Sequence, residues 1–425
     1  MEGMIIMGMT MTEKIIASHA GLEEVKPGQL VTAKVDKIMA HDITGPPAFN
    51  ELRKHNLESS VEPGRIALVL DHIVPPKDID STLNCMAVRD FAKEKGIDDF
   101  FDIGRGGIAH NVLPEEGLVV PGDLVIGADS HTCTYGALGC FSTGMGHTDI
   151  AAAMVLGETW LRVPESMLFT YNGKLGKYVS GKDMILATIG KISVNGADYK
   201  AMEFIGSAID ALPMEQRFTM TNMVIECGGK NGLMRIDQAT REYVNARTKR
   251  DYEEYVSDDD VKYESYHEFD ASAIEPLVAK PFSPDNVSPV ADVKDVKVDQ
   301  VFIGSCTNGW LDDLRQASYI LEGEKLAKGL RLIVIPATMG IYQKALKEGI
   351  LDAFIDAGGV VSPSTCGPCP GLHQGVMGPN EVGVFTTNRN FRGRTGHPDA
   401  QIYLASPYTA AATAIMGTIT DPREI

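Results

Sequence analysis

The sequence has no apolar run that approaches the length of a membrane span, and its beginning lacks the marks of a secretory leader. Met1 to Ile16 is rich in Met and Ile but has no basic segment and no small-residue cleavage site. With 44% hydrophobic and 23% charged residues, the composition is typical of a globular protein in water. An odd number of cysteines, seven, without a leader fits a reducing compartment, so we expect a cytoplasmic protein.

Positive charge is also scarce. The chain carries 39 Lys and Arg residues against 57 Asp and Glu residues, which gives a formal net charge of -18. A protein that binds nucleic acid needs a basic face, so this composition argues against that function. An anionic substrate would have to be bound by a local group of basic side chains.

The length of 425 residues exceeds what one ordinary core can fill, and the pattern predicts three α/β domains. The first is expected over residues 1–164 and the second over residues 165–295. The second ends in a polar tract, residues 249–295, that holds three consecutive aspartates and several prolines and is expected to carry little core. The third domain is expected over residues 296–425.

Hydrophobic runs and turn residues predict alternating strands and helices. Strands are expected at 65–70, 123–127, 298–304, 331–336 and 381–387. Helices are expected at 148–157, capped by Thr148 and ended by Gly157, at 342–347, at 351–357, and between Ser406-Pro407 and Gly417. Alternation of this kind makes parallel sheets, in which the carboxyl ends of the strands lie along one edge.

Three cysteines stand where predicted strands end. Cys306 follows the strand at 298–304, and Cys366 and Cys369 share one loop that the flanking prolines keep non-helical and exposed. Loops about sixty positions apart can meet at one sheet edge. Three thiolates on strand ends can hold an iron–sulfur cluster and leave one metal corner for a substrate.

Other interpretations of these cysteines remain open. Cys366-Gly-Pro-Cys369 is also a thioredoxin-like tetrapeptide, but that motif opens a helix and would leave Cys306 unexplained. The same thiolates with His373 could form a structural zinc site. All cysteines could instead be buried small hydrophobes, which is our interpretation of the remaining four: Cys85, Cys133, Cys140 and Cys227.

Acid–imidazole pairs cluster at other predicted strand ends. Asp71 and His72 follow one strand, His110 sits in a glycine-rich turn, and Asp129 and His131 follow another strand. An Asp beside a His can orient the imidazole and raise its pKa, as a general acid or a charged substrate anchor requires. One such His is more often structural, but three at strand ends favour a functional site.

Two further groups suggest a carboxylate pocket. Arg389 and Arg394 follow the predicted strand at 381–387, and arginine forks bind carboxylates bidentately. A solvated basic loop is the alternative, which the acidity of the chain disfavours. Asn222 and Glu226, four residues apart, are expected on one helix face, and by themselves they indicate no more than a surface pair.

Five motifs in this order resemble the aconitase family, and the resemblance covers nearly the whole chain. The motifs are Asp71-His72, Asp129-Ser-His131, Gly304-Ser-Cys-Thr-Asn308, Cys366-Gly-Pro-Cys369 and Asn388-Arg-Asn-Phe-Arg-Gly-Arg394. The resemblance implies three α/β domains around a central 4Fe-4S cluster, whose open iron binds substrate. Because the chain ends at Ile425, we expect it to lack the swivel domain of aconitases proper. It is similar to the branch that acts on isopropylmalate or homocitrate, in which that domain is a separate small subunit.

The resemblance also assigns roles to residues. It implies that Cys306, Cys366 and Cys369 hold the cluster. It implies acid–base roles for Asp71, His72, His110, Asp129, His131 and Glu226. It implies substrate-binding roles for His41, Ser130, Asn222, Asn388, Arg389 and Arg394. The activity implied is a hydro-lyase that removes water from a hydroxy di- or tricarboxylic acid and adds it back, with the proton-abstracting base on the small subunit of a heterodimer or heterotetramer.

The chain departs from the family pattern at three places. Trp310 and Pro370-Gly371 are expected to reshape the rim of the cluster site, and Thr134 replaces an asparagine of true aconitases, which argues against citrate as substrate. Two non-enzyme alternatives remain. RNA binding by a cluster-free relative is opposed by the charge, and a zinc or cluster scaffold would leave the histidines and arginines without a role.

Overall fold

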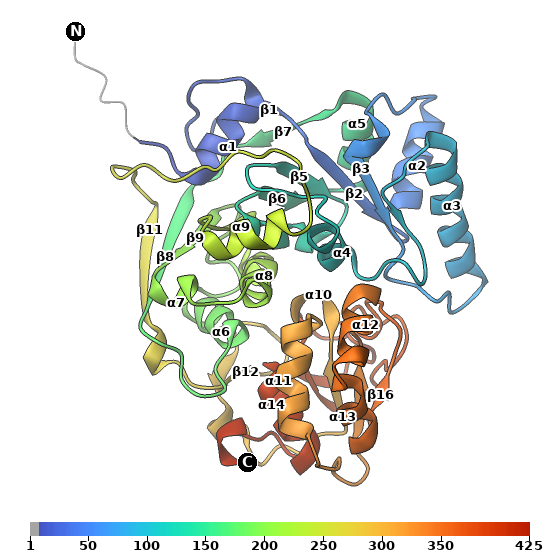
Figure 1. Cartoon of the computed structure of the whole chain (residues 1–425), viewed down its shortest axis with the longest axis vertical. Coiled ribbons are helices and arrows are strands. Elements are labelled where there is room, and N and C mark those ends of the chain that lie inside the picture. Colours follow the sequence, from blue (N-terminus) through green and yellow to red (C-terminus); the bar gives the residue numbers. More distant parts are fainter. Residues whose placement is uncertain (1–7) are drawn as a thin grey trace.

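A computed structural model of the chain describes residues 8–425, whose strands form four sheets (Figure 1). Residues 1–7, part of the segment considered above as a leader, lie outside the described residues. Between residues 8 and 425, none of the helices has both the length and the apolar character that crossing a membrane requires. The chain starts with α1 (Met11–Ala20), and a small antiparallel sheet pairs β1 (Leu30–Lys34) with β7 (Glu158–Arg162).

A five-stranded parallel sheet with the order β4-β3-β2-β5-β6 lies in the N-terminal part. Its strands are β2 (Lys37–His41), β3 (Ile66–Val69), β4 (Phe100–Phe101), β5 (Leu124–Gly127) and β6 (Phe141–Gly144). This confirms the two strands predicted there. Because His41 pairs with Val69 in the β2–β3 register, His41 and the nearby Asp71 leave the sheet side by side.

Helices flank this sheet on both of its faces (Figure 1). They are α2 (Gly45–Lys54), α3 (Ile79–Lys95), α4 (Ala109–Glu115), the 3-10 helix η2 (Ser130–Leu138) and α5 (His147–Leu156). The predicted end of α5 at Gly157 is confirmed by a left-handed φ of +72°. Its predicted cap is wrong, because the helix begins one residue before Thr148 and Gly146 occupies the cap position without a side-chain bond.

A four-stranded parallel sheet forms the left side of Figure 1, in the order β10-β9-β8-β11. Its strands are β8 (Ser166–Asn172), β9 (Ala201–Ile205), β10 (Asn231–Met234) and β11 (Ser265–Asp270). The helices here are α6 (Gly181–Ile192), α7 (Ser207–Asp210), α8 (Met214–Asn222), η3 (Met223–Cys227) and α9 (Gln238–Asn245). Helix α8 packs on η2, which links this sheet to the first.

The C-terminal part is built on a seven-stranded sheet with the order β13-β12-β18-β17-β14-β15-β16. Its parallel strands are β14 (Gln300–Ile303), β15 (Arg331–Val334), β16 (Val360–Val361), β17 (Val382–Phe385) and β18 (Gln401–Ala405). The helices are α10 (Ser305–Asn308), α11 (Leu311–Leu321), α12 (Met339–Lys347), α13 (Ile350–Ala357) and α14 (Pro407–Met416). The predicted strands and helices of this region are confirmed, including the Ser406 cap of α14 and its end at Gly417.

The polar tract at 249–295 carries more core than expected. Besides β11, it holds β12 (Leu277–Ala279) and β13 (Val287–Pro289), which extend the seven-stranded sheet in antiparallel fashion. The side chains of Val278 and Val290 are fully buried. Three short strands among polar residues were not recognised as strands because each presents only one or two apolar side chains to the core. The division into domains at residues 164 and 295 stays a prediction.

The carboxyl edges of the first and third sheets face each other across the centre of the molecule. Gly107 forms a β-bridge with Thr338, and the amide of Ile108 donates to the carbonyl of Ala337 at 2.7 Å. Deeper in, the amide of Cys366 donates to the carbonyl of Asp71 at 2.8 Å. Strand ends from both sheets therefore converge on one place.

Candidate active site

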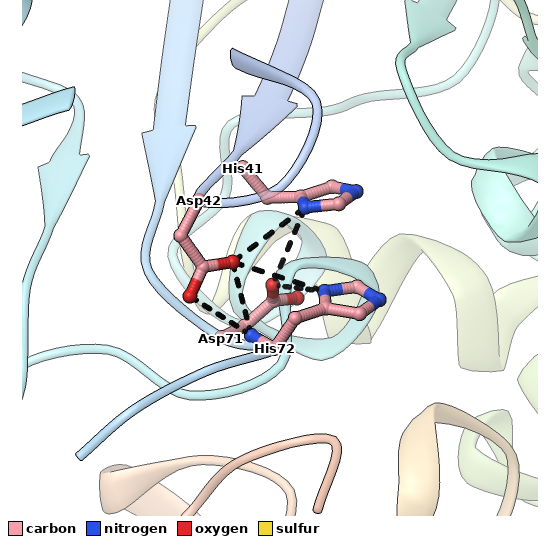
Figure 2. Close-up of side chains that lie close together, drawn as sticks. All are labelled: His41, Asp42, Asp71 and His72. Carbon is pink, nitrogen blue, oxygen red and sulfur yellow. Dashed lines mark hydrogen bonds and ion pairs between the residues drawn. The ribbon is translucent and has the colours of Figure 1, made fainter. Parts of the chain in front are cut away.

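Asp71 and His72 form a tight pair at the end of β3 (Figure 2). The Nδ1 atom of His72 lies 2.5 Å from Oδ1 of Asp71, and the other oxygen of Asp71 accepts the amide N–H of Ala109 at 2.9 Å. Burial alone lowers the pKa of His72, but the carboxylate of Asp71, helped by Asp129 and Asp42, raises it to about 9. His72 is therefore a charged imidazole at neutral pH.

His41, the last residue of β2, stacks on His72 (Figure 2). The ring centroids lie 4.1 Å apart at an angle of 15°. Both rings turn Nδ1 toward the carboxylates of Asp42 and Asp71 and Nε2 toward the opposite side. Nε2 of His41 is buried, has no hydrogen-bond partner within residues 8–425, and lies 3.7 Å from the Asp129 carboxylate. An unsatisfied buried nitrogen at this place suits a polar ligand.

Asp42 is a member of this group that the sequence reasoning missed. Its carboxylate accepts the amide N–H of His72 at 3.1 and 3.2 Å and that of Ile73 at 2.9 Å. Burial raises the pKa of Asp42, but His41 and His72 outweigh this effect and hold it below the usual range. The signal was present, because Asp42 follows a strand-ending histidine in the way that His72 follows Asp71.

Asp129 lies at the centre of four imidazoles. Its Oδ1 atom lies 2.8 Å from Nε2 of His110 and accepts the amide N–H of His131 at 2.8 Å. Its Oδ2 atom lies 3.7 Å from Nε2 of His41 and 3.8 Å from Nε2 of His72. Burial raises the pKa of Asp129, but His110 and His131 outweigh this effect. The pKa of the carboxyl therefore lies well below its usual value.

Glu226 joins His131 to Arg389. Nε2 of His131 lies 2.8 Å from Oε1 of Glu226, and Nε of Arg389 donates to both oxygens at 2.9 Å. Nη2 of Arg389 also donates to the hydroxyl of Ser130 at 2.9 Å. The surface-pair interpretation of Asn222 and Glu226 is wrong, because both are buried and they lie on α8 and η3 respectively. The polar residues around Asn222 and Glu226 suggested exposure, although the apolar residues at 223–225 between them indicated burial.

The three cysteines lie next to these groups. Nδ2 of Asn388 lies 3.4 Å from Sγ of Cys306, and Oδ1 of Asn388 lies 3.8 Å from Sγ of Cys369. Asn222 adds a second amide N–H to Cys306 at 3.2 Å. The β14–β17 register pairs Phe302 with Phe385, which explains why Cys306 and Asn388 emerge together.

Two details of the cysteine prediction are wrong. Cys306 lies in the short helix α10, not in a loop, because its strand turns directly into a helical turn. The loop of Cys366 and Cys369 is buried instead of exposed, because it packs between the two sheet edges. The predicted burial of Cys85, Cys133, Cys140 and Cys227 is confirmed.

The geometry disfavours the zinc and thioredoxin interpretations. Ligand atoms of a tetrahedral zinc site each lie about 2.0 to 2.3 Å from one ion. No group of three such atoms within 4.8 Å of one another includes these cysteines in residues 8–425, and Nε2 of His373 is turned to the carbonyl of His72 at 3.0 Å. No helix begins at Cys366, as a thioredoxin-type pair requires, because residues 367–370 form turns. Spaced, buried thiols suit a multi-metal cluster better.

The two arginines of the loop differ in environment. Arg394 lies near Cys369, where its guanidinium and that of Arg389 oppose the rise in the pKa of the thiol that burial causes. The backbone of Arg394 passes close to Gly371, where φ is +70° and a Cβ atom would lie 2.8 Å from the Arg394 carbonyl. Arg392 instead points outward over the ring of Phe282.

Two of the departures from the family pattern lie behind the site. Trp310 is buried and stacks on Phe218 with ring centroids 4.8 Å apart, so it fills core and does not line a rim. The hydroxyl of Thr134 accepts from Nδ2 of Asn222 at 2.9 Å, and Asn222 in turn donates to Cys306. Thr134 therefore acts on the cysteine site only through Asn222, whose amide it holds in place.

His72 gives a pH-dependent prediction. Because its folded-state pKa of about 9 lies above the ordinary value of 6.5, its protonation stabilises the fold fully below pH 6.5, and this contribution is lost as pH rises through 9. NMR of histidine-labelled protein should show one imidazole still charged at pH 8, and this signal should be missing in His72→Gln. In Asp71→Asn the same signal should titrate at lower pH. A His72 signal already neutral at pH 7.5 in the unmodified chain would contradict the assignment.

Comparison with known proteins shows the family of the chain. The chain matches the family model described as aconitase family (aconitate hydratase) over residues 13–417. It is 56% identical over 419 residues to the 3-isopropylmalate dehydratase large subunit of Moorella thermoacetica, covering 99% of this chain and 100% of that protein. It is 57% identical over 424 residues to the 3-isopropylmalate dehydratase large subunit of Aquifex aeolicus, covering 99% and 98%. The solved structure of Thermococcus kodakaraensis aconitase X is 13% identical, covers 90% of this chain and 94% of that chain, and gives a TM-score of 0.49. The chain belongs to the aconitase family.

Proposed function

We propose that the chain is the large catalytic subunit of a 3-isopropylmalate dehydratase, a hydro-lyase that interconverts 2-isopropylmalate and 3-isopropylmalate in leucine biosynthesis. The observation that carries the proposal is the meeting of two acid–imidazole pairs, a Glu226–Arg389 pair and three buried cysteines at facing sheet edges. The names of relatives that match 99% of the chain support the substrate. We place the reaction in the cytoplasm.

In this proposal Cys306, Cys366 and Cys369 hold a 4Fe-4S cluster. The donor set fits, because all three sulfurs are buried and two amide N–H groups, from Asn222 and Asn388, can stabilise negative charge on the sulfur of Cys306. When bound, such a cluster supplies a Lewis-acidic iron for the hydroxyl group of the substrate.

His72 is the proposed general acid. Loss of water requires a proton on the departing oxygen, and His72 is held in its charged form by Asp71 at 2.5 Å. Its Nε2 atom, the atom that would donate the proton, points away from Asp71 (Figure 2). This atom lies 3.8 Å from Oδ2 of Asp129. His110, whose pKa burial lowers, is better suited to accept a proton or a hydrogen bond than to donate a proton.

Carboxylate binding falls to the loop after β17 and to neighbouring hydroxyl and imidazole groups. Arg389 keeps its guanidinium fixed through Glu226 and Ser130, and Arg394 has an Nε–H that finds no partner within the described residues. A malate derivative carries two carboxylates, so two separately placed guanidinium groups match it. His41 offers its unsatisfied Nε2 atom to a further substrate oxygen.

A base must also remove the carbon-bound proton of the substrate. We propose that a small subunit brings this base, together with part of the carboxylate site, in a heterodimer or heterotetramer. The relatives are named large subunits, which implies a separate smaller partner for those proteins.

The first test concerns the cluster. After anaerobic purification the chain should be brown and hold about four irons, and Cys306→Ser should abolish assembly because one of three thiolates is lost. Iron and sulfide analysis measures this. Cys85→Ser is a matched control, a buried cysteine on α3 that is outside the site and should leave the iron content unchanged. A colourless protein with one tightly held zinc would contradict the proposal.

The second test concerns substrate and partner. The cluster-loaded chain alone should show no isomerase activity, and activity should appear on mixing with a matching small subunit and 2-isopropylmalate. Homocitrate and methylmalate derivatives serve as competitors, compared by kcat/KM. Isomerase activity from the isolated chain would show that the base lies here, and a preference for homocitrate would replace the proposed substrate.

The third test concerns Arg389. Arg389→Lys keeps the charge but loses the planar fork, so transition-state binding in the reconstituted complex should weaken by roughly 1.5 to 3 kcal/mol. Iron content should stay unchanged. Arg392→Lys, on the same loop but with a side chain 60% exposed, is the control and should change kcat/KM little. Equal losses at both positions would mean that the loop acts only as a general positive field.

A further inference from the structure

Lys182 is a buried cation that neither the motifs nor the proposed chemistry includes. It is the second residue of α6, and its side chain has no exposure to solvent. Its ammonium donates to three oxygens: Oδ1 of Asn308 at 3.0 Å and the carbonyls of Thr386 and Thr387 at 2.8 and 2.7 Å. All three acceptors are neutral.

These acceptors belong to the two segments that shape the cysteine site. Asn308 closes α10, the helix that carries Cys306. Thr386 and Thr387 directly precede Asn388, whose amide contacts the sulfurs of Cys306 and Cys369. One ammonium therefore ties the Cys306 segment to the Asn388 segment from behind, at the ends of two adjacent strands.

A buried ammonium is stable only if a negative charge nearby offsets its loss of hydration. A buried ammonium with neutral acceptors alone is unfavourable, and burial lowers the pKa of Lys182 to about 7 although Asp313 and Asp183 oppose this shift. The other buried cations have a direct carboxylate partner, Asp99 for Lys37 at 2.9 Å and Asp237 for Arg217 at 2.6 Å. Lys182 reaches the carboxylate of Asp313 only through the amide of Asn308, which donates to it at 2.9 Å.

Besides the carboxylates of Asp313 and Asp183, the sulfurs of Cys369 and Cys306 are the groups whose negative charge favours the charged form of Lys182. We propose that Lys182 is a positioning residue of the cysteine site, which holds α10 against the end of β17 and balances the negative charge of the thiolates and of the cluster that they hold. The inference rests on the proposed function, since it assumes a cluster. It acts through Asn308 and Asn388, not by contact with a reacting atom.

The test compares two substitutions. Lys182→Gln keeps a hydrogen-bond donor but removes the charge, and Lys182→Met removes both. Each chain is reconstituted anaerobically with iron and sulfide, and iron content, the rate of iron loss in air and the midpoint potential of the cluster are measured. Circular dichroism of the cluster-free chains checks their fold, and Lys182→Gln serves where Lys182→Met does not fold.

Both variants should shift the midpoint potential to more negative values, because the reduced cluster carries more negative charge and loses a nearby cation. Lys182→Met should lose iron at least about tenfold faster than the unmodified chain, as removal of charged hydrogen bonds implies, and Lys182→Gln should be intermediate. Lys37→Met is the matched control, a buried lysine at the opposite end of β2 from His41, and it should leave the potential and the rate of iron loss unchanged.

The outcomes separate the two proposals. If the unmodified chain takes up a cluster and Lys182→Gln keeps its potential and its rate of iron loss, Lys182 is only a structural residue and this inference is wrong. If the unmodified chain takes up no cluster, the proposed function is wrong, and this inference falls with it.

Discussion

The site depends on one largely buried carboxylate, that of Asp129 at the end of β5. An ionised carboxylate removed from water needs donors, and Asp129 obtains them from His110 on α4 and from the backbone and ring of His131 on η2. As a result, α4 and η2 both pack at the end of β5. The rings of His41 and His72 face the remaining oxygen from the two adjacent strands. Four imidazoles from different elements thus lie around the single carboxylate of Asp129.

The same region pushes two histidines in opposite directions. His72 has a carboxylate of its own at 2.5 Å, and its pKa rises to about 9. His110 shares Asp129 with His131, and burial lowers its pKa. One environment thus shifts the pKa of two imidazoles in opposite directions without any difference in residue type. At His72 the carboxylates of Asp71, Asp129 and Asp42 outweigh burial, whereas at His110 burial outweighs Asp129.

The parts of the site that follow from strand ends could be predicted from the sequence, and the parts that depend on packing between sheets could not. Asp71, His72 and Asp129 stand directly after apolar strands, so alternation and the parallel-sheet rule place them together. Asn222 lies at the end of a polar helix, and only its contact with Cys306 shows that it faces inward. Asp42 had a signal in its place after the strand-ending His41. Lys182 had none, because its role arises from an amide oxygen and two backbone carbonyls that the fold brings near. The strands β12 and β13 were missed for the same reason, since neighbours from distant sequence bury them.

In a chain with a net charge of -18, the placement of each cation in the site has consequences for the ligand. Arg389 is already paired with Glu226, and His72 with Asp71, so both hold their geometry before any substrate arrives. Preorganisation of this kind lowers the cost of ordering side chains, and in the proposed binding mode a substrate carboxylate would compete with Glu226 for Arg389. The Arg394 guanidinium lies near the thiol of Cys369, but its Nε atom has no partner in the described part of the chain. In the proposed binding mode, a ligand with two carboxylates would therefore meet two unlike groups, one guanidinium already fixed by Glu226 and Ser130 and another with an Nε–H unpartnered within residues 8–425.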